Sequence, residues 1–171
     1  MEFINIEIKA RTAKAAAIRK YLQANNAAFK GTDWQTDTYF NTIIGRLKLR
    51  QGNIENNLIY YKRENQAGPK QSNFSLLEVS DPDALKSMLA SAIGIKVTVE
   101  KEREIFFIDN VKFHLDTVKQ LGNFVEIEAS NKYAPLSVDE LNDQCNFYMK
   151  EFEIENNDLV NISYSDMLLE L

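Results

Sequence analysis

The sequence lacks several features that define common classes of protein. Its single cysteine, Cys145, cannot form an internal disulfide, which is typical of a protein from a reducing compartment. No apolar run approaches the roughly 20 residues that cross a bilayer, and the first residues show a strand pattern instead of a signal peptide. These absences predict a cytoplasmic protein with no membrane partner.

An excess of positive charge is also missing. The 171 residues include 20 Lys and Arg against 25 Asp and Glu, a formal net charge of −5. Broad nucleic-acid binding needs outward-facing basic patches, so no nucleic-acid partner is expected. Phosphate-loop, dinucleotide and zinc motifs are absent too, and His114 is the only histidine. The length and globular composition predict a single domain over residues 1–171.

Six segments share one pattern, in which apolar residues alternate with charged or amide residues. The first runs from Phe3 to Arg11, where isoleucines alternate with Asn5, Glu7 and Lys9. A period of two is typical of a β-strand. The other five segments are 46–50, 60–63, 99–103, 112–116 and 124–128.

Turn and capping signals extend this pattern to eight strands and four helices. The strands are expected at 3–11, 33–41, 46–50, 58–64, 73–79, 95–108, 111–118 and 124–129. The helices are expected at 12–29, 81–92, 137–152 and 164–169, and residues 66–72 are expected to form a loop. Predicted caps are Thr12, Asp81 with Pro82, and a capping box of Ser137 and Glu140. Mostly hairpin connections favour an antiparallel sheet.

The charged strand faces allow two architectures. In an open α+β sheet, all of these charges would meet bulk water and the helices would cover the other face. In a closed eight-stranded barrel, the apolar faces would point outward under the helices and the charges would line the inside. The mixture of cations and carboxylates favours the barrel, because a site for a metal-bound polyphosphate needs both. The predicted fold is therefore α+β, a largely antiparallel eight-stranded β-barrel, or tunnel, with a charged lumen and helices packed outside.

The alternating charges supply the candidate site residues. Guanidinium groups bind phosphate oxygens with paired hydrogen bonds, and lysines act as point charges. Carboxylate oxygens suit Mg²⁺ or Mn²⁺, which bridge protein carboxylates to substrate phosphates. The candidate cations are Lys9, Arg46, Lys48, Arg50, Lys62, Lys101 and Arg103, and the candidate carboxylates are Glu7, Asp116, Glu126 and Glu128. The structural alternative is that these charges only form salt bridges with one another.

Taken together, these segments resemble the CYTH-domain family, the triphosphate tunnel metalloenzymes, and within it the class IV adenylyl cyclases. The opening family signature, Glu-x-Glu-x-Lys, corresponds to residues 5–9, with Asn5 in place of the first glutamate. Further similar stretches are 35–40, 46–50, 61–63, 100–103, 115–128 and 163–169. The resemblance therefore extends over nearly the whole chain.

The resemblance implies a role for each candidate residue. The metal, Mg²⁺ or Mn²⁺, would be held by Glu7, Asp116, Glu126 and Glu128. The triphosphate would be held by Lys9, Arg46, Lys48, Arg50, Lys62, Lys101 and Arg103, of which Lys9, Arg50 and Lys62, with Asp116, would be catalytic. The implied enzyme is a class IV-type adenylyl cyclase that converts ATP to cyclic AMP and pyrophosphate. The oligomeric state stays open between a monomer and a homodimer.

Two alternatives to the cyclase stay open. The same lining would suit hydrolysis of inorganic triphosphate, thiamine triphosphate or a nucleoside triphosphate. A weakened enzyme that only binds polyphosphate or nucleotide is the other alternative, because Asn5 offers a metal a neutral oxygen in place of a charged one.

Overall fold

The computed structural model describes residues 2–62, 68–132 and 134–171. The strands are β1 (Glu2–Arg11), β2 (Ala28–Phe40), β3 (Arg46–Gln51), β4 (Asn56–Lys62), β5 (Lys70–Glu78), β6 (Ile95–Ile108), β7 (Val111–Val118) and β8 (Gly122–Ser130). The helices are α1 (Ala15–Ala24), α2 (Pro82–Ile93), α3 (Val138–Glu151) and α4 (Tyr164–Leu169), with a single 3-10 turn, η1 (Asn156–Asp158). None of the helices in these ranges is long and apolar enough to span a bilayer.

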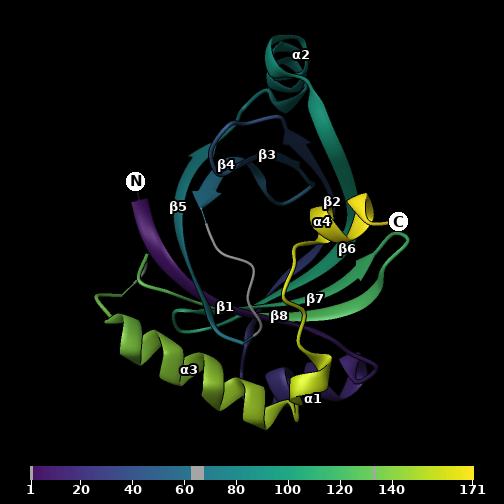
Figure 1. The fold of residues 1–171 in the computed structure, drawn as a ribbon. Coiled ribbons are helices and arrows are strands. Elements are labelled where there is room, and N and C mark those ends of the chain that lie inside the picture. The colour runs from purple at the N-terminus through teal and green to yellow at the C-terminus, as the bar shows by residue number, and fades with distance from the viewer. Residues whose placement is uncertain (1, 63–67, 133) are drawn as a thin grey trace.

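The eight strands close into a barrel in the order β1-β5-β4-β3-β2-β6-β7-β8 (Figure 1). Every neighbouring pair is antiparallel. Helices α1 and α3 lie together against β1 and β8, α2 lies at the far end beside β2 and β3, and α4 lies beside β6. The predicted α+β barrel with external helices is confirmed.

The main core lies outside the barrel, between its wall and the helices. Ile6, Ile8 and Ile127 point outward from β1 and β8 and pack against α1 and α3, where Leu22 and Leu141 are fully buried. Because alternate residues point to opposite faces, this packing directs the charged residues of the same strands inward. The predicted apolar coat and charged interior are therefore correct for this part of the barrel.

Cys145 belongs to this outer core. It is fully buried on α3, and its thiol donates a hydrogen bond to the carbonyl oxygen of Ile6 at 3.2 Å. Burial raises the pKa of the Cys145 thiol to about 12. The predicted packing role is confirmed, since such a thiol stays protonated and unreactive.

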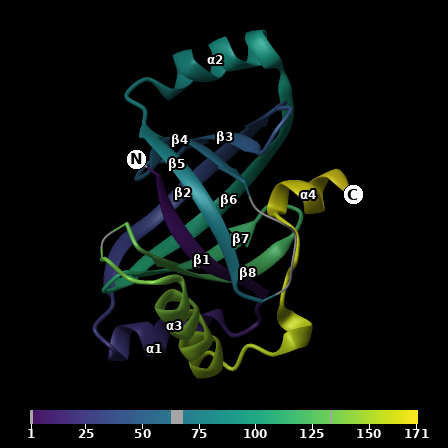
Figure 2. The same ribbon diagram turned by 60° about the vertical axis from the view of Figure 1, so that its left-hand side comes forward.

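Strand β5 departs from this pattern, and aromatic residues of β4 and β5 point into the barrel. In Figure 2, β5 crosses the front of the barrel, with α2 beyond one end and α3 beyond the other. Its outward residues, including Asn73 and Ser75, are exposed and mostly polar, whereas Phe74 points inward. Tyr61 of β4 also points inward. The prediction of an apolar outer face was therefore wrong for β5, whose outer surface meets solvent, whereas the outward positions of β4 include Leu58 and Tyr60.

The first helix is shorter than expected. The predicted helix 12–29 ends at Ala24, because Asn26 adopts a left-handed φ of 57° and Ala28 already begins β2. Thr12 is not the N-cap, a position that Lys14 occupies; the Thr12 hydroxyl instead accepts a hydrogen bond from the Lys14 backbone N–H.

The expected loop at 66–72 is partly strand, because β5 begins at Lys70. Residues 66 and 67, and the end of the strand expected at 58–64, lie outside the described residues. The capping predictions for the other helices are confirmed. Asp81 accepts a hydrogen bond from the backbone N–H of Ala84, and Ser137 forms the capping box with Glu140.

Candidate functional site

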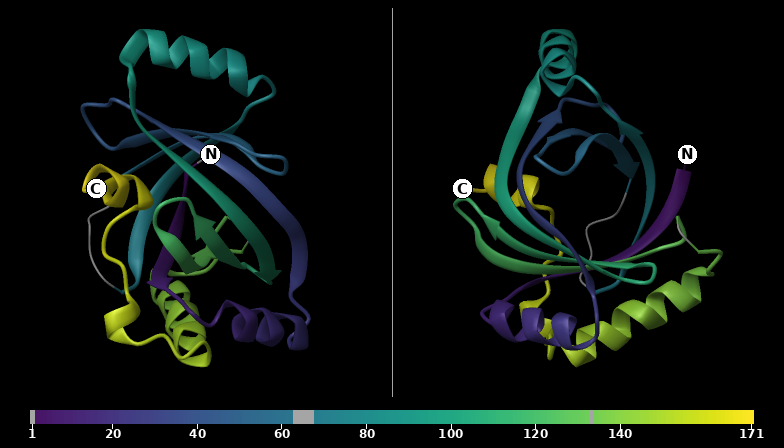
Figure 3. Two further views of the ribbon diagram at one scale, coloured as in Figure 1. Left: turned by 90° about the vertical axis from the view of Figure 1, so that its right-hand side faces the viewer. Right: turned by 180° about the vertical axis from the view of Figure 1, so that it is seen from behind.

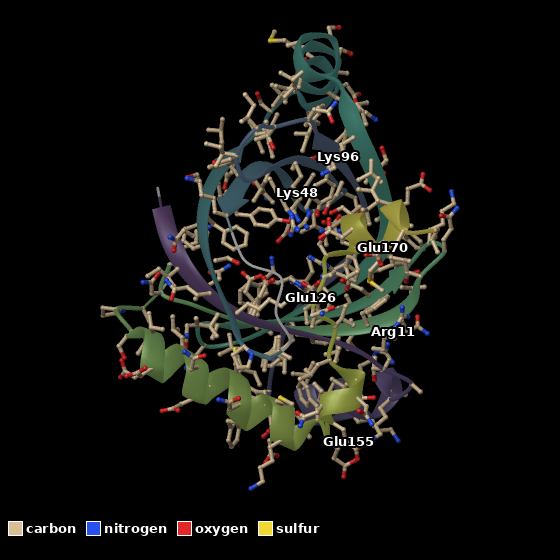
Figure 4. All side chains as sticks on the ribbon, viewed as in Figure 1. Arg11, Lys48, Lys96, Glu126, Glu155 and Glu170 are labelled. Atoms are coloured by element: carbon tan, nitrogen blue, oxygen red, sulfur yellow. The ribbon has the colours of Figure 1, made fainter. Side chains whose placement is uncertain are left out.

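A cavity inside the barrel is lined by inward side chains of all eight strands. In Figure 4, Lys48 and Glu126 extend into the interior from opposite sides, whereas Arg11, Glu155 and Glu170 lie outside. Lys96 of β6 is exposed. The charged and amide side chains lining the cavity are Asn5, Glu7, Lys9, Asp37, Lys48, Arg50, Glu55, Asn57, Lys101, Arg103, Lys112, Glu126 and Glu128, with His114 beside them.

One cluster in the cavity centres on Asp37 of β2. Arg50 donates two hydrogen bonds to its carboxylate, each 2.9 Å long, and Lys101 donates a third at 2.7 Å. Lys48 lies 3.3 Å from the same carboxylate. Burial alone would raise the pKa of Asp37, but the charges of Arg50, Lys101 and Lys48 hold it well below its usual range. Asp37 is therefore an anion that keeps three cations in place.

A second cluster joins β6, β7 and β8. Arg103 donates to Asp116 through two hydrogen bonds of 2.7 and 2.5 Å, and it lies 3.4 Å from Glu126. Lys9 lies 3.6 Å from the other oxygen of Glu126, and Nδ1 of His114 lies 3.2 Å from Glu126. Burial would raise the pKa of Glu126, but Arg103 and Lys9 hold it well below the usual value. This cluster therefore also keeps cations beside a charged carboxylate.

Glu55, in the turn between β3 and β4, is the centre of a third cluster of charged residues. It accepts a hydrogen bond from Arg50 at 3.0 Å and a short one from Lys112. The fully buried Asp33 fixes this turn, because its carboxylate accepts the backbone N–H groups of Ile54 and Glu55 at 2.9 and 3.0 Å. Asp33 therefore aims the Glu55 side chain into the cavity.

The C-terminal segment contributes part of the cavity wall. Figure 3 shows it running from the end of the molecule near α1 along the barrel to α4. Val160 donates its backbone N–H to the carbonyl of Lys9, and the Tyr164 hydroxyl donates to Asp116 at 2.8 Å. Arg46 pairs with Asp166 at 2.6 Å, which joins β3 to α4. Residues far apart in the sequence thus complete one site.

Most residues predicted from the sequence meet in this cavity. The eight that line it are Glu7, Lys9, Lys48, Arg50, Lys101, Arg103, Glu126 and Glu128. Arg46 and Asp116 come from the same inner strand faces but are engaged by Asp166 and by Arg103 with Tyr164, and neither is among the described lining residues.

Lys62 is not brought to the site, which corrects its predicted substrate-binding and catalytic roles. Its side chain is exposed, because Ile59 and Tyr61 take the inward positions of β4 and alternation then directs Lys62 to the outer surface.

Sequence reasoning gave no role to Asp37, Glu55, Lys70 and Lys112, although Asp37 lies within a stretch that carried the family resemblance. Lys112 begins the alternating segment 112–116 and shares one strand face with His114 and Asp116. This alternation could have identified Lys112 as a residue that points into the cavity. Glu55 lies in a turn, where there is no alternation of residues to predict the direction of its side chain. Lys70 is buried inside β5, and its ammonium donates to the carbonyl of Val160 at 3.3 Å.

The oxygen donors of β1 and β8 fit a divalent metal. Glu7 and Glu128 are direct cross-strand partners and both line the cavity. Asn5 donates through Nδ2 to Glu128 at 2.7 Å, while its buried Oδ1 has no hydrogen-bond partner among the described residues. Within those residues no three Asp, Glu, His or Cys side chains already surround one point. Mg²⁺ commonly needs only one or two carboxylates, because water and substrate phosphates complete its shell.

Burial and charge also affect Lys101. Burial and the charges of Arg103, Arg50 and Lys48 outweigh the attraction of Asp37 and lower the pKa of Lys101 to about 7. Isolated buried charges cost several kcal/mol each, so such a cluster is a poor stabilising core. Buried cations gathered in one cavity suit a compact polyanion, because phosphate oxygens accept the same N–H groups that carboxylate oxygens do.

Comparison with known proteins now gives the family. The sequence model of the CYTH domain matches residues 4–162. A comparison with curated protein sequences gives no match.

Several solved structures share the fold at low sequence identity. The PH1012 protein from Pyrococcus horikoshii OT3 is 21% identical with a TM-score of 0.80, over 95% of this chain and 98% of that one. A candidate adenylate cyclase from Vibrio parahaemolyticus is 18% identical with a TM-score of 0.78, over 97% and 98%. HpAC1 from Hippeastrum, a candidate adenylyl cyclase described as having a dominant triphosphatase activity, is 16% identical with a TM-score of 0.62, over 96% and 94%. These similarities establish the barrel fold.

Proposed function

Because the chain belongs to the CYTH domain family, we propose that it is a metal-dependent enzyme that binds a triphosphate inside the barrel and breaks one of its phosphorus–oxygen bonds. One observation carries this proposal: five buried or nearly buried cations from three strands line a single cavity. They are Lys9, Lys48, Arg50, Lys101 and Arg103. Phosphoryl and nucleotidyl transfer need mainly positioning and charge neutralisation, which such a lining supplies without a protein nucleophile.

In this proposal, phosphate oxygens of the substrate take the place of carboxylate oxygens as hydrogen-bond acceptors of the cations. The paired N–H groups of Arg50 now bind the Asp37 carboxylate, and they match the spacing of two phosphate oxygens equally well. Lys48 and Lys101 flank the same position and neutralise the added negative charge. Asp37 remains beside them and keeps the cations oriented.

The metal would be held by Glu7 and Glu128, with Glu126 and Oδ1 of Asn5 as further oxygen donors. When bound, a divalent ion supplies neutralisation of phosphate charge and activation of the attacking hydroxyl or water. Lys9 lies between this oxygen-rich wall and the cation cluster, where its ammonium orients Glu126.

The reaction we propose is that of a class IV-type adenylyl cyclase acting on ATP. The ribose 3′-oxygen forms a bond to the α-phosphorus, and the bond from that phosphorus to the α–β bridging oxygen breaks. Pyrophosphate leaves with the bridging oxygen, and the hydroxyl proton passes to solvent. The fixed cations stabilise the charge that develops on the departing pyrophosphate. The fold shared with the Vibrio parahaemolyticus protein supports this reading.

A triphosphatase is the second candidate. In that case water attacks the terminal phosphorus of inorganic triphosphate, thiamine triphosphate or a nucleoside triphosphate, and orthophosphate is released. The fold shared with HpAC1 favours this candidate. Asn5 favours a third reading, a polyphosphate binder with weakened catalysis, because it removes one negative charge from the metal side of the cavity.

A substrate panel distinguishes these functions. The purified protein is incubated with Mg²⁺ or Mn²⁺ and with ATP, thiamine triphosphate or inorganic triphosphate, and the products are identified. Cyclic AMP with pyrophosphate supports the cyclase, and orthophosphate supports the triphosphatase. Tight binding without turnover supports the binder, and the absence of both binding and turnover contradicts the proposal. Arg50→Ala should abolish either activity, while Lys96→Ala, at an exposed position of β6, serves as the control.

A further inference from the structure

One ion pair crosses the interior of the barrel. Glu55, in the turn between β3 and β4, accepts a hydrogen bond from the ammonium of Lys112, near the start of β7. In the closed barrel, β2 and β6 separate β3 from β7 on one side, and β5, β1 and β8 separate β4 from β7 on the other. The two residues therefore come from nearly opposite walls. We call the Glu55–Lys112 pair the crossbar.

The crossbar is held in place by its surroundings. The second carboxylate oxygen of Glu55 accepts a hydrogen bond from Arg50 at 3.0 Å, and Asp33 fixes the turn from below. Only glycine fits at Gly52 in this turn, because a Cβ there would lie 2.5 Å from the Asp33 carboxylate. Burial would raise the pKa of Glu55, but Lys112 and Arg50 hold it below its usual value. Glu55 is therefore an anchored anion.

The crossbar lies at the boundary between two hollows. Glu55 and Lys112 line the charged cavity, and both also line a second hollow of about 460 Å³. The second hollow is formed by residues at the same end of the barrel as the β3–β4 turn, among them Asn56 and Asn110. The interior thus continues beyond the crossbar, where there is room for more phosphate groups.

The two hollows differ in charge. Five cations in addition to Lys112 line the cavity, where they are gathered for phosphate. Among the described residues that line the second hollow, the carboxylates of Glu55, Glu78 and Glu128 outnumber the ammonium groups of Lys112 and Lys132. Like charges brought together disfavour binding, so a polyanion is stabilised on one side of the crossbar and not on the other.

The cation-lined stretch is also short. The inward positions of β7 are Lys112 at the crossbar, then His114 and Asp116. Asp116 accepts a hydrogen bond from the Tyr164 hydroxyl at 2.8 Å, which brings the C-terminal segment to this level of the barrel. Four residues of extended strand, from Lys112 to Asp116, span about 13 Å. A compact phosphate chain matches this stretch, whereas a long chain would have to pass the crossbar.

We propose that Glu55 sets the length of the phosphate chain that the barrel accepts, because the crossbar ends the cation-lined stretch and excludes long polyphosphates. This inference rests on the proposed function, since it places the phosphates of the substrate on the cation cluster. Glu55 is then a specificity-determining residue. It acts against chains that the cations alone would attract more strongly, because longer chains carry more negative charge.

Calorimetric titration in EDTA tests the inference without turnover. The probes are inorganic triphosphate and a long linear polyphosphate, and the affinity of each is measured per chain of probe. Glu55→Ala removes one end of the crossbar. Its matched control, Glu78→Ala, removes an equal charge from the wall of the second hollow and leaves both ends of the crossbar in place. Relative to triphosphate, polyphosphate should bind Glu55→Ala at least about tenfold more tightly than it binds the native chain, and Glu78→Ala should change this ratio less than about twofold.

Lys112→Ala separates the crossbar from net charge. It removes the other end of the pair, and with it a positive charge instead of a negative one. The loss of a cation weakens the binding of every polyanion, yet the ratio of polyphosphate to triphosphate affinity should still rise. This variant also serves if Glu55→Ala fails to fold.

Three results would overturn the role of Glu55 while leaving the proposed function intact. They are a native ratio in Glu55→Ala, a rise in Glu78→Ala as large as that in Glu55→Ala, and a native chain that binds the long polyphosphate as tightly as triphosphate. In each of these cases triphosphate still binds in the barrel. A native chain that binds neither probe overturns both the inference and the proposed function.

Discussion

Arg50 and Asp37 form a buried pair inside the barrel, joined by two hydrogen bonds of 2.9 Å each. The two residues are direct neighbours across β2 and β3. Asp37 also binds Lys101 and Lys48, so one carboxylate lies against three cations. This arrangement keeps the cations close together, against their mutual repulsion, at the position proposed for phosphate.

Asp37→Asn should therefore destabilise the protein and make it more responsive to triphosphate. Removing one partner of a buried ion pair typically costs about 3–5 kcal/mol, because the remaining charge stays uncompensated. Bound triphosphate would take over the charge balance, so added inorganic triphosphate should raise the melting temperature of Asp37→Asn more than that of the native chain. Thermal unfolding with and without the ligand measures both effects.

The control for this prediction is Glu100→Gln, which removes an exposed carboxylate that pairs with Lys119 on the surface. Exposed pairs contribute about 0–1 kcal/mol, so this variant should unfold at nearly the native temperature. If Asp37→Asn were as stable as Glu100→Gln, and no more responsive to triphosphate than the native chain, Asp37 would not be balancing the cations.

Lys101 should link substrate binding to proton uptake. Burial lowers its pKa to about 7 in the folded protein, against an ordinary value of 10.5. Between these two values the unfolded chain binds more protons, so this group's penalty on stability is largest below pH 7 and disappears as pH rises toward 10.5. A bound polyanion raises the pKa of Lys101, and binding at pH 8 should take up as much as about one proton.

Calorimetry in buffers of different ionisation enthalpy measures this proton uptake directly. Lys101→Met should take up fewer protons than the native chain when inorganic triphosphate binds. Lys96→Met changes an exposed lysine of the same strand and should leave the uptake unchanged. Equal uptake in all three proteins would show that Lys101 is already charged before the ligand binds.

The inward residues could be predicted where the alternation was regular. In Arg46 to Arg50, leucines alternate with cations, so one face of the strand is charged and the other is apolar. The segment from Tyr60 to Arg63 has two aromatic residues followed by two basic ones, so each face of the strand carries one aromatic and one basic residue. The alternation therefore does not tell which face points inward. The packing of Tyr61 and Phe74 inside the barrel decides that case, and it places Lys62 outside.

The partners of each charge depend on strand order and register, which a single sequence does not specify. Lys101 reaches Asp37 from a position 64 residues away. Glu55 meets Lys112 only because the β3–β4 turn lies at the same end of the barrel as the start of β7. The stacked rings of Phe3, Phe74 and Tyr61 likewise meet only when β5 lies between β1 and β4. These relationships required the three-dimensional structure.

Lys48→Ala and Lys62→Ala form a matched pair that tests the inner wall. Lys48 lines the cavity beside Asp37, so its loss should lower kcat/KM on the preferred triphosphate by about 10²-fold, as is usual for one transition-state charge partner. Lys62 is exposed on the outer surface, and its loss should change kcat/KM less than twofold. Steady-state kinetics under the same metal concentration compares them. Equal losses in the two variants would contradict the placement of Lys62.

Asn5→Glu tests the metal side of the cavity without relying on activity. Asn5 now donates a hydrogen bond to Glu128, and a glutamate there would instead place a second negative charge beside that carboxylate. Like charges at this distance repel, so the metal-free variant should be less stable than the native chain. Mg²⁺ or Mn²⁺ would neutralise both groups, and each ion should raise the melting temperature of Asn5→Glu more than that of the native protein. Asn5→Gln retains the neutral amide and should show the native response to metal. An Asn5→Glu variant that gained no more from the metal than Asn5→Gln would place the divalent ion away from β1 and β8.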